Sequence, residues 1–119
     1  MVRMPSNVEV LPGRNSGDRI LRFEGPLTLG SLFDVQPLLR EETAGTTILD
    51  LTNVPYMDSA AVGMLVGFHV SSQRNGRKYA ITGVADRIRK MLAICQVDKI
   101  LVMEANKEAA EVRFASAAT

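Results

Sequence analysis

The sequence predicts a single α/β domain in which an N-terminal β-hairpin is followed by alternating strands and helices. At 119 residues the chain is long enough for one hydrophobic core and too short for two. After the hairpin, apolar segments of strand length alternate three times with longer amphipathic segments, and no linker or repeat interrupts them. This pattern predicts a mixed sheet with its helices mainly on one face, formed by one domain over residues 1–119 with disordered tails at 1–5 and 116–119.

The first elements are the hairpin and a helix. Asn7–Leu11 alternates between apolar and polar residues as a half-buried strand does, and a dense run of turn formers separates it from a second strand at Arg19–Glu24. A helical pattern over Leu29–Glu42 contains Pro37, which removes a backbone donor. We therefore expect this helix either to kink at Pro37 or to start late, with Asp34 as its cap.

The rest of the chain continues the alternation. A central buried strand at Thr46–Leu51 leads through a turn into a helix at Ser59–Asn75, which a glycine ends. The same patterns predict four further elements: a strand at Tyr79–Thr82, a helix at Ala85–Cys95, a buried strand at Ile100–Met103 and a helix at Asn106–Ala115. Cys95 takes a core-facing position in its helix.

Charge and composition restrict the classes of function. The formal net charge is +1 with acids and bases scattered, which gives no reason to expect a nucleic-acid partner. The single cysteine excludes an internal disulfide, and the single histidine removes most hydrolytic and metal-binding constellations. The sequence shows neither the charged and apolar regions of a signal peptide nor an apolar run with the length of a membrane span, so we expect neither. We expect a cytoplasmic protein without enzymatic activity, cofactor or metal, whose partner is a protein or a small molecule.

The candidate site is the turn at Thr52–Asp58, between the central strand and the next helix. Backbone N–H groups and the positive end of the helix converge where a parallel strand gives way to a helix, and function tends to lie there. Asp58 and Ser59 are in the first turn of that helix. Aspartate and serine are also preferred helix caps, so a purely structural role is the alternative for this pair.

The turn carries a resemblance to a known family. Val54–Gly63 resembles the signature loop and helix of STAS domains, in particular those of the bacterial anti-sigma factor antagonists. Ile48–Leu51 resembles the central strand of that family, Gly25–Leu27 its Gly-x-Leu after the second strand, and Arg87–Leu92 its third helix. The resemblance follows the element order over nearly the whole chain and is most specific from Asp58 to Gly63. It implies a STAS-like single domain.

The resemblance also implies a switch protein. In that family the serine after the aspartate is phosphorylated by a partner that is both a kinase and an anti-sigma factor, and a metal-dependent serine phosphatase reverses the reaction. The unphosphorylated form binds the anti-sigma factor and frees the sigma factor. By position the phosphoacceptor is Ser59, with Asp58 beside it. A phosphate in the first turn of a helix meets unpaired N–H groups, so we expect its charge to act on the partner with little change of fold.

Two positions depart from the family pattern. Ala60 and Ala61 stand where the family usually has serine or threonine and then glycine, although they keep the side chains small. Thr28 replaces an acidic residue that helps set the site. Asp50 is a charge inside an apolar strand, and it either supports the loop through hydrogen bonds or is solvated near the strand end. The departures motivate the alternative function, a non-phosphorylated STAS subunit of a signalling scaffold or a lipid-transport complex.

A partner surface is expected on the helix that follows Ser59. Its apolar residues point in nearly every direction, so either some are exposed near the site or the helix is buried between neighbours. Basic residues on a later helix either meet an acidic partner or form a solvated face. The expected partner-binding residues are Ala60, Ala61, Val62, Met64, Arg87 and Arg89.

Overall fold

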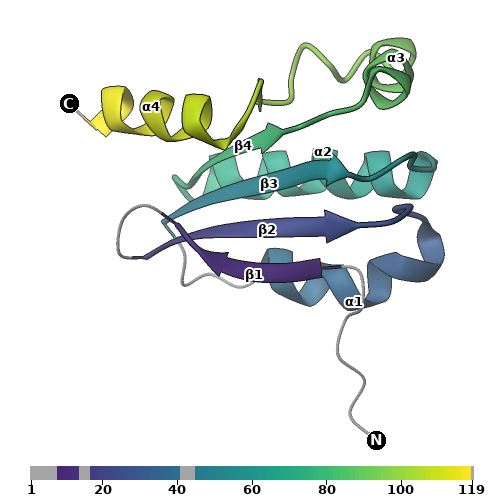
Figure 1. Ribbon diagram of the computed structural model, residues 1–119, viewed down its shortest axis with the longest axis horizontal. Coiled ribbons are helices and arrows are strands. Elements are labelled where there is room, and N and C mark those ends of the chain that lie inside the picture. Colours follow the sequence, from purple (N-terminus) through teal and green to yellow (C-terminus); the bar gives the residue numbers. More distant parts are fainter. Residues whose placement is uncertain (1–7, 14–16, 41–44, 119) are drawn as a thin grey trace, which may run out of the picture.

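The computed structural model describes residues 8–13, 17–40 and 45–118, and its elements are arranged around one five-stranded sheet (Figure 1). The strands lie in the order in which they occur along the chain: β1 (Val8–Pro12), β2 (Asp18–Glu24), β3 (Thr46–Asn53), β4 (Lys78–Thr82) and β5 (Met103–Glu104). β1 and β2 pair antiparallel, whereas β2, β3, β4 and β5 pair parallel. The predicted hairpin and mixed sheet are confirmed.

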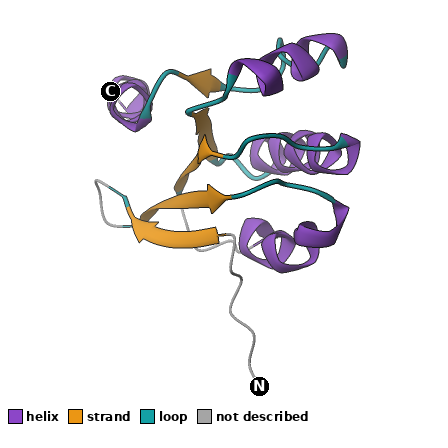
Figure 2. Cartoon of the chain, turned by 45° about the vertical axis from the view of Figure 1, so that its right-hand side comes forward, coloured by secondary structure: helices purple, strands orange, loops and turns teal. Residues whose placement is uncertain are grey.

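The helices cover the two faces of the sheet unequally (Figure 2). Three lie on one face: α1 (Leu29–Arg40), α2 (Ser59–Arg74) and α3 (Asp86–Ile94). The fourth, α4 (Lys107–Ala118), lies on the other face. None of the described helices is long and apolar enough to span a membrane. The expectation of helices mainly on one face is confirmed.

Strands β2 and β3 contribute side chains to cores on both faces of the sheet. Leu21 and Leu49 belong to the larger core under α1, α2 and α3, whereas Ile20 and Ile48 meet Ala110 of α4 in a smaller one. Burial of each such leucine or isoleucine contributes roughly 1.5–3 kcal/mol. Because β3 is buried on both faces, the loop that leaves its carboxyl end starts from a fixed position.

Helix α1 begins at Leu29 and continues through Pro37, so the late start at Asp34 was wrong. The carbonyl of Thr28 accepts hydrogen bonds from the N–H groups of Ser31 and Leu32, which starts the helix at Leu29, five residues before Asp34. Pro37 deprives only one carbonyl of its helical donor, and both proline and the residue one turn before it are exposed, so water can satisfy that group.

The C-terminal part differs from the prediction in three places. β5 spans only Met103–Glu104, because the N–H groups of Ile100 and Leu101 donate to the carbonyl of Val97 in a turn. α4 extends to Ala118, so the expected tail was wrong for residues 116–118; residues 1–5 and 119 lie outside the described part. Cys95 is exposed and follows the last residue of α3, so the core-facing position expected for it was wrong.

Candidate functional site

Two loops lie side by side at the carboxyl end of the parallel strands. One follows β2 and the other follows β3, and Leu27 and Met57 form a parallel bridge between them. The N–H of Leu27 donates to the carbonyl of Tyr56 over 3.1 Å, and the N–H of Asp58 donates to the carbonyl of Leu27 over 3.1 Å. Both bridging side chains are buried. This pairing brings the N-termini of α1 and α2 to one place.

The carboxylate of Asp58 caps both helices. Its Oδ1 accepts a hydrogen bond from the N–H of Ala61 in α2 over 3.0 Å, and its Oδ2 accepts one from the N–H of Leu29 in α1 over 2.9 Å. These bonds, that of Ala61 first, hold the pKa of Asp58 below its ordinary value. The expected cap on α2 is confirmed; the bond to α1 joins residues far apart in the sequence and was not predicted.

The two bonds of Asp58 predict an order of stability among variants. Asparagine has one acceptor oxygen, so Asp58→Asn keeps one of the two caps, whereas Asp58→Ala keeps neither. We expect the free energy of unfolding at about pH 7 to fall from wild type to Asp58→Asn to Asp58→Ala, as measured by urea denaturation. Equal stability of the alanine and asparagine variants would contradict the double cap.

Because the pKa of Asp58 is lowered, the difference in stability between wild type and Asp58→Asn depends on pH. The ionised carboxylate is the better acceptor, so its stabilisation is present above the unfolded pKa of 3.8 and is lost as the pH falls through the lower folded pKa. We expect the stability gap between wild type and Asp58→Asn to narrow when urea denaturation is repeated at about pH 3. A gap that stays constant would show that ionisation of Asp58 contributes nothing.

Ser59 is the first residue of α2 and is exposed. Within the described part of the chain, its hydroxyl neither donates nor accepts a hydrogen bond. Asp58, not Ser59, takes the N–H groups that a capping hydroxyl would use. The Ser59 hydroxyl is therefore accessible to an enzyme or a partner without any change in the helix.

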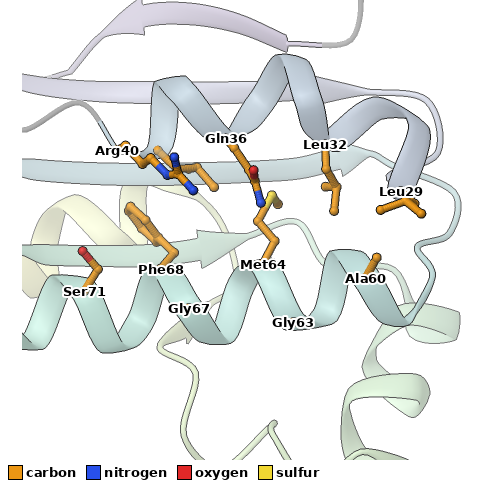
Figure 3. Close-up of a pocket in the computed structure, with 11 residues that line it drawn as sticks. Leu29, Leu32, Gln36, Arg40, Ala60, Gly63, Met64, Gly67, Phe68 and Ser71 are labelled. Carbon is orange, nitrogen blue, oxygen red and sulfur yellow. The ribbon is translucent and has the colours of Figure 1, made fainter.

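A groove runs between α1 and α2, with Ala60, the residue after Ser59, at one end (Figure 3). Its volume is about 500 Å³. Both helices line it, with Leu29, Leu32, Gln36 and Arg40 from α1 and Ala60, Met64 and Phe68 from α2. Gly63 and Gly67 widen the groove, because the place of a Cβ at either one has no neighbouring atom within 4 Å. The groove thus leads from Ala60, next to Ser59, toward Arg40.

The fold and this site match a known family. The model of the STAS domain matches residues 10–110, which include both paired loops, the Asp58 cap and the groove. The chain belongs to the STAS domain family. The family predicted from the Val54–Gly63 resemblance is thereby confirmed.

Several proteins are similar to this STAS domain. The anti-sigma-B factor antagonist of Staphylococcus aureus (strain NCTC 8325 / PS 47) is 33% identical over 67 residues, which cover 56% of this chain and 62% of that protein. A sulfate transporter family protein from Wolinella succinogenes is 25% identical, with a TM-score of 0.69 over 84% of this chain and 88% of that one. The Bacillus cell fate determinant SpoIIAA, solved in its phosphorylated form, has a TM-score of 0.65 at 14% identity, over 87% of this chain and 96% of that one, and this likeness shows the fold alone.

Most of the surface expected on α2 of this STAS domain is buried. Ala61, Val62 and Met64 belong to the core, so their assignment as exposed partner contacts was wrong. The alternative, a helix buried between neighbours, holds because α2 packs against the sheet and lies beside α1. Ala60 is half-buried at the rim of the groove. Met64 reaches the groove only as part of its floor.

The exposed apolar side chains near Ser59 come from elsewhere. Leu29 is 61% exposed and Phe33 75% exposed on α1, and Tyr56 of the neighbouring loop is 44% exposed. Leu29 and Phe33 are one turn apart and share a helix face. In the structure Leu32, Val35 and Leu39 form the buried stripe of α1, which leaves Leu29 and Phe33 outside it; the helical spacing alone did not separate the two groups.

Of the remaining predicted site residues, Thr28 lies beside the Asp58 cap, whereas Asp50 makes no described hydrogen bond to it. Thr28 directly precedes Leu29, and its N–H donates to Oγ of Ser31 over 2.9 Å, so it lies beside the Asp58 cap. Asp50 makes no described hydrogen bond to Asp58; it accepts from the N–H of Thr52 over 3.0 Å and pairs with Arg22 at 3.7 Å. Asp50 therefore supports the start of the loop, and the alternative of a merely solvated charge was wrong.

The basic residues of α3 are exposed. Arg87 and Arg89 lie on the outer side of that helix, whereas Ile88 and Leu92 are buried. Neither arginine forms an ion pair with any residue in the described ranges. Their position allows either a solvated face or contact with an acidic partner, as the sequence predicted.

Proposed function

We propose that this STAS domain is an anti-sigma factor antagonist whose binding to an anti-sigma factor is controlled by phosphorylation of Ser59. The observation that carries the proposal is an exposed, unbonded serine hydroxyl at the first turn of α2, next to Asp58, whose carboxylate accepts a hydrogen bond from the N–H of the exposed Leu29. Relatives with the printed name anti-sigma-B factor antagonist support it. This chain spans 62% of their length, so their activity is carried over here as a proposal.

The docking surface for the anti-sigma factor consists of Ser59, Leu29, Phe33 and Tyr56, together with the adjoining groove. A group of large apolar side chains around a polar centre is typical of a protein interface. Arg40, at the far end of the groove, adds a positive charge for an acidic residue of the partner. Phosphate on Ser59 would place its charge inside this surface.

The effect of phosphate follows from Asp58. The carboxylate already takes the N–H groups of Ala61 and Leu29, so the phosphate cannot use those two donors. It adds about −1.5 to −2 charges beside an ionised carboxylate. The added charge therefore stays in solvent, where it repels acidic groups and must lose its hydration when the partner docks.

Two partner enzymes control the phosphorylation of Ser59 in this switch. The anti-sigma factor acts as the serine kinase and a metal-dependent serine phosphatase restores the binding form, in the cytoplasm. The domain itself is the substrate of these enzymes and carries out no catalysis. Ala60, half-buried beside Ser59, leaves room for the kinase, because its side chain is only a methyl group.

The second candidate is a non-phosphorylated STAS subunit of a scaffold or a transport complex. The double cap by Asp58 favours it, because it gives the Asp58-Ser59 pair a structural purpose without any phosphate. The likeness to a sulfate transporter family protein is in keeping with it. Under this function Ser59 stays unmodified and the protein elutes in a stable multi-subunit particle.

Phosphopeptide mapping separates the two functions. The protein is isolated from its own cells in growth and under stress and analysed by mass spectrometry, with Ser59→Ala as the control. We expect phosphate on Ser59 at an occupancy that changes with the condition, and none in the variant. Unmodified Ser59 under every condition, in a particle of constant composition, would overturn the switch in favour of the subunit.

A further inference from the structure

A second cavity lies at the edge of β4, away from Ser59. β5 pairs only with Ile81 and Thr82, so within the described ranges no strand pairs with the first half of β4 on that side. A cavity of about 260 Å³ opens there, lined by the C-terminal half of α2, the start of β4 and Phe114 of α4. Ligand pockets for drug-sized molecules measure about 300–1,000 Å³, so this one suits a smaller molecule.

Two buried polar side chains of α2 line this cavity. Ser72 is 3% exposed, and its hydroxyl has no hydrogen-bond partner among the described residues. His69 is 6% exposed, and its Nδ1 lies 2.7 Å from the hydroxyl of Tyr79. Buried polar groups are nearly always hydrogen-bonded, so the Ser72 hydroxyl lacks a partner that the fold itself does not supply.

The hydrogen bonds of Tyr79 bear on which ring nitrogen of His69 carries the proton. The Tyr79 oxygen accepts a bond from the N–H of Val102 over 3.1 Å. Because the hydroxyl proton of Tyr79 has no other acceptor among the described residues, we assign the tautomer in which it is donated to Nδ1 of the imidazole. The neutral ring then carries its proton on Nε2, which has no partner in the described part of the chain. His69 and Ser72 therefore offer two donors side by side along α2.

The charge of the cavity favours an anion. Arg77 and Lys78 line it, and no acidic side chain does so among the residues that the structure describes. The other walls are apolar and come from the ring of Tyr79, Val102 and Phe114. Two donors, basic residues and an aromatic wall together fit a molecule with one anionic group on a compact apolar body.

We propose that this cavity binds a small organic carboxylate. The carboxylate oxygens accept hydrogen bonds from Nε2 of His69 and the hydroxyl of Ser72, Lys78 supplies charge, and the apolar body rests on Phe114. Ser72 lies about 20 Å along α2 from Ser59, at about 1.5 Å per residue. The site is thus separate from the docking surface and does not rest on the proposed function.

The single histidine of the chain provides the test. The ring signals of His69 are followed by NMR during titration with benzoate, and with benzyl alcohol as the uncharged counterpart. We expect a saturable shift with benzoate at a Kd of about 1 mM and none with the alcohol at the same concentrations. No saturation by about ten times that concentration, or an equal response to both probes, would overturn the proposal.

Variants locate the binding. Ser72→Ala removes an unsatisfied hydroxyl, so we expect a folded protein that binds benzoate about tenfold more weakly. Lys78→Gln should weaken binding about threefold, and Lys90→Gln on α3, the matched control, should leave it unchanged. Wild-type affinity in both Ser72→Ala and Lys78→Gln would show that benzoate binds elsewhere and would overturn the site.

Discussion

Replacing Ser59 by aspartate is expected to weaken binding to the anti-sigma factor by about 100-fold, or about 2.7 kcal/mol. The variant places a permanent charge at the centre of the docking surface, beside the ionised Asp58. Its own fold should not suffer, because an acidic residue in the first turn of α2 interacts favourably with the helix dipole. Isothermal titration calorimetry with the purified anti-sigma factor of the same organism measures the change.

Ser59→Asn is the matched control for that measurement. Asparagine has the shape of aspartate without its charge, so we expect it to weaken binding by no more than about tenfold, through size alone. Ser59→Ala should bind like the wild type and resist phosphorylation. If aspartate and asparagine weakened binding equally, the effect of Ser59 would be steric and the electrostatic part of the proposal would fail.

Gly83→Ala is expected to lower the free energy of unfolding by about 3 kcal/mol. Gly83 follows β4 with φ +70°, a conformation that side chains with a Cβ rarely adopt. A Cβ there would overlap Oγ1 of Thr52 and lie 2.9 Å from its backbone N and Cα. The Thr52 hydroxyl is bonded to Asp50 and cannot turn aside without losing that bond. Urea denaturation measures the loss.

Gly76→Ala separates the two causes of that loss. Gly76 also has a positive φ, +66°, but the place of its Cβ has no neighbouring atom within 4 Å. It should cost only the backbone strain, about 1 kcal/mol. The difference between the two variants measures the close contact between Gly83 and the end of β3. Equal losses would show that this contact contributes nothing to stability.

The order of the elements was accessible from the sequence because local patterns determine it. The alternation of short apolar strands with amphipathic helices, the turn residues and the glycine after α2 are read within a few residues of each element. Errors appeared where the surroundings of a residue in the folded chain, which the local pattern does not contain, decided the outcome. Pro37 was expected to interrupt or delay α1, yet its exposed position lets water replace the missing bond.

The part of the candidate site that local patterns determine was also accessible from the sequence. Asp58 and Ser59 stand at a recognisable helix start, so the cap on α2 follows from neighbouring residues. The bond from Leu29 to Asp58 depends on the pairing of two distant loops, which no local pattern contains. The prediction that apolar residues of α2 near Ser59 are exposed was wrong for a similar reason, because the sequence does not show how many neighbours cover a helix.

The double cap by Asp58 determines what kind of kinase can act on this domain. An enzyme that reads its substrate as an extended peptide would have to unwind the first turn of α2 and break both bonds of the carboxylate. A kinase for Ser59 must instead accept a folded helix start and recognise the surface around it. Under the proposed switch, the kinase and the anti-sigma factor would both have to recognise the same folded surface around Ser59, as they would if they are one protein.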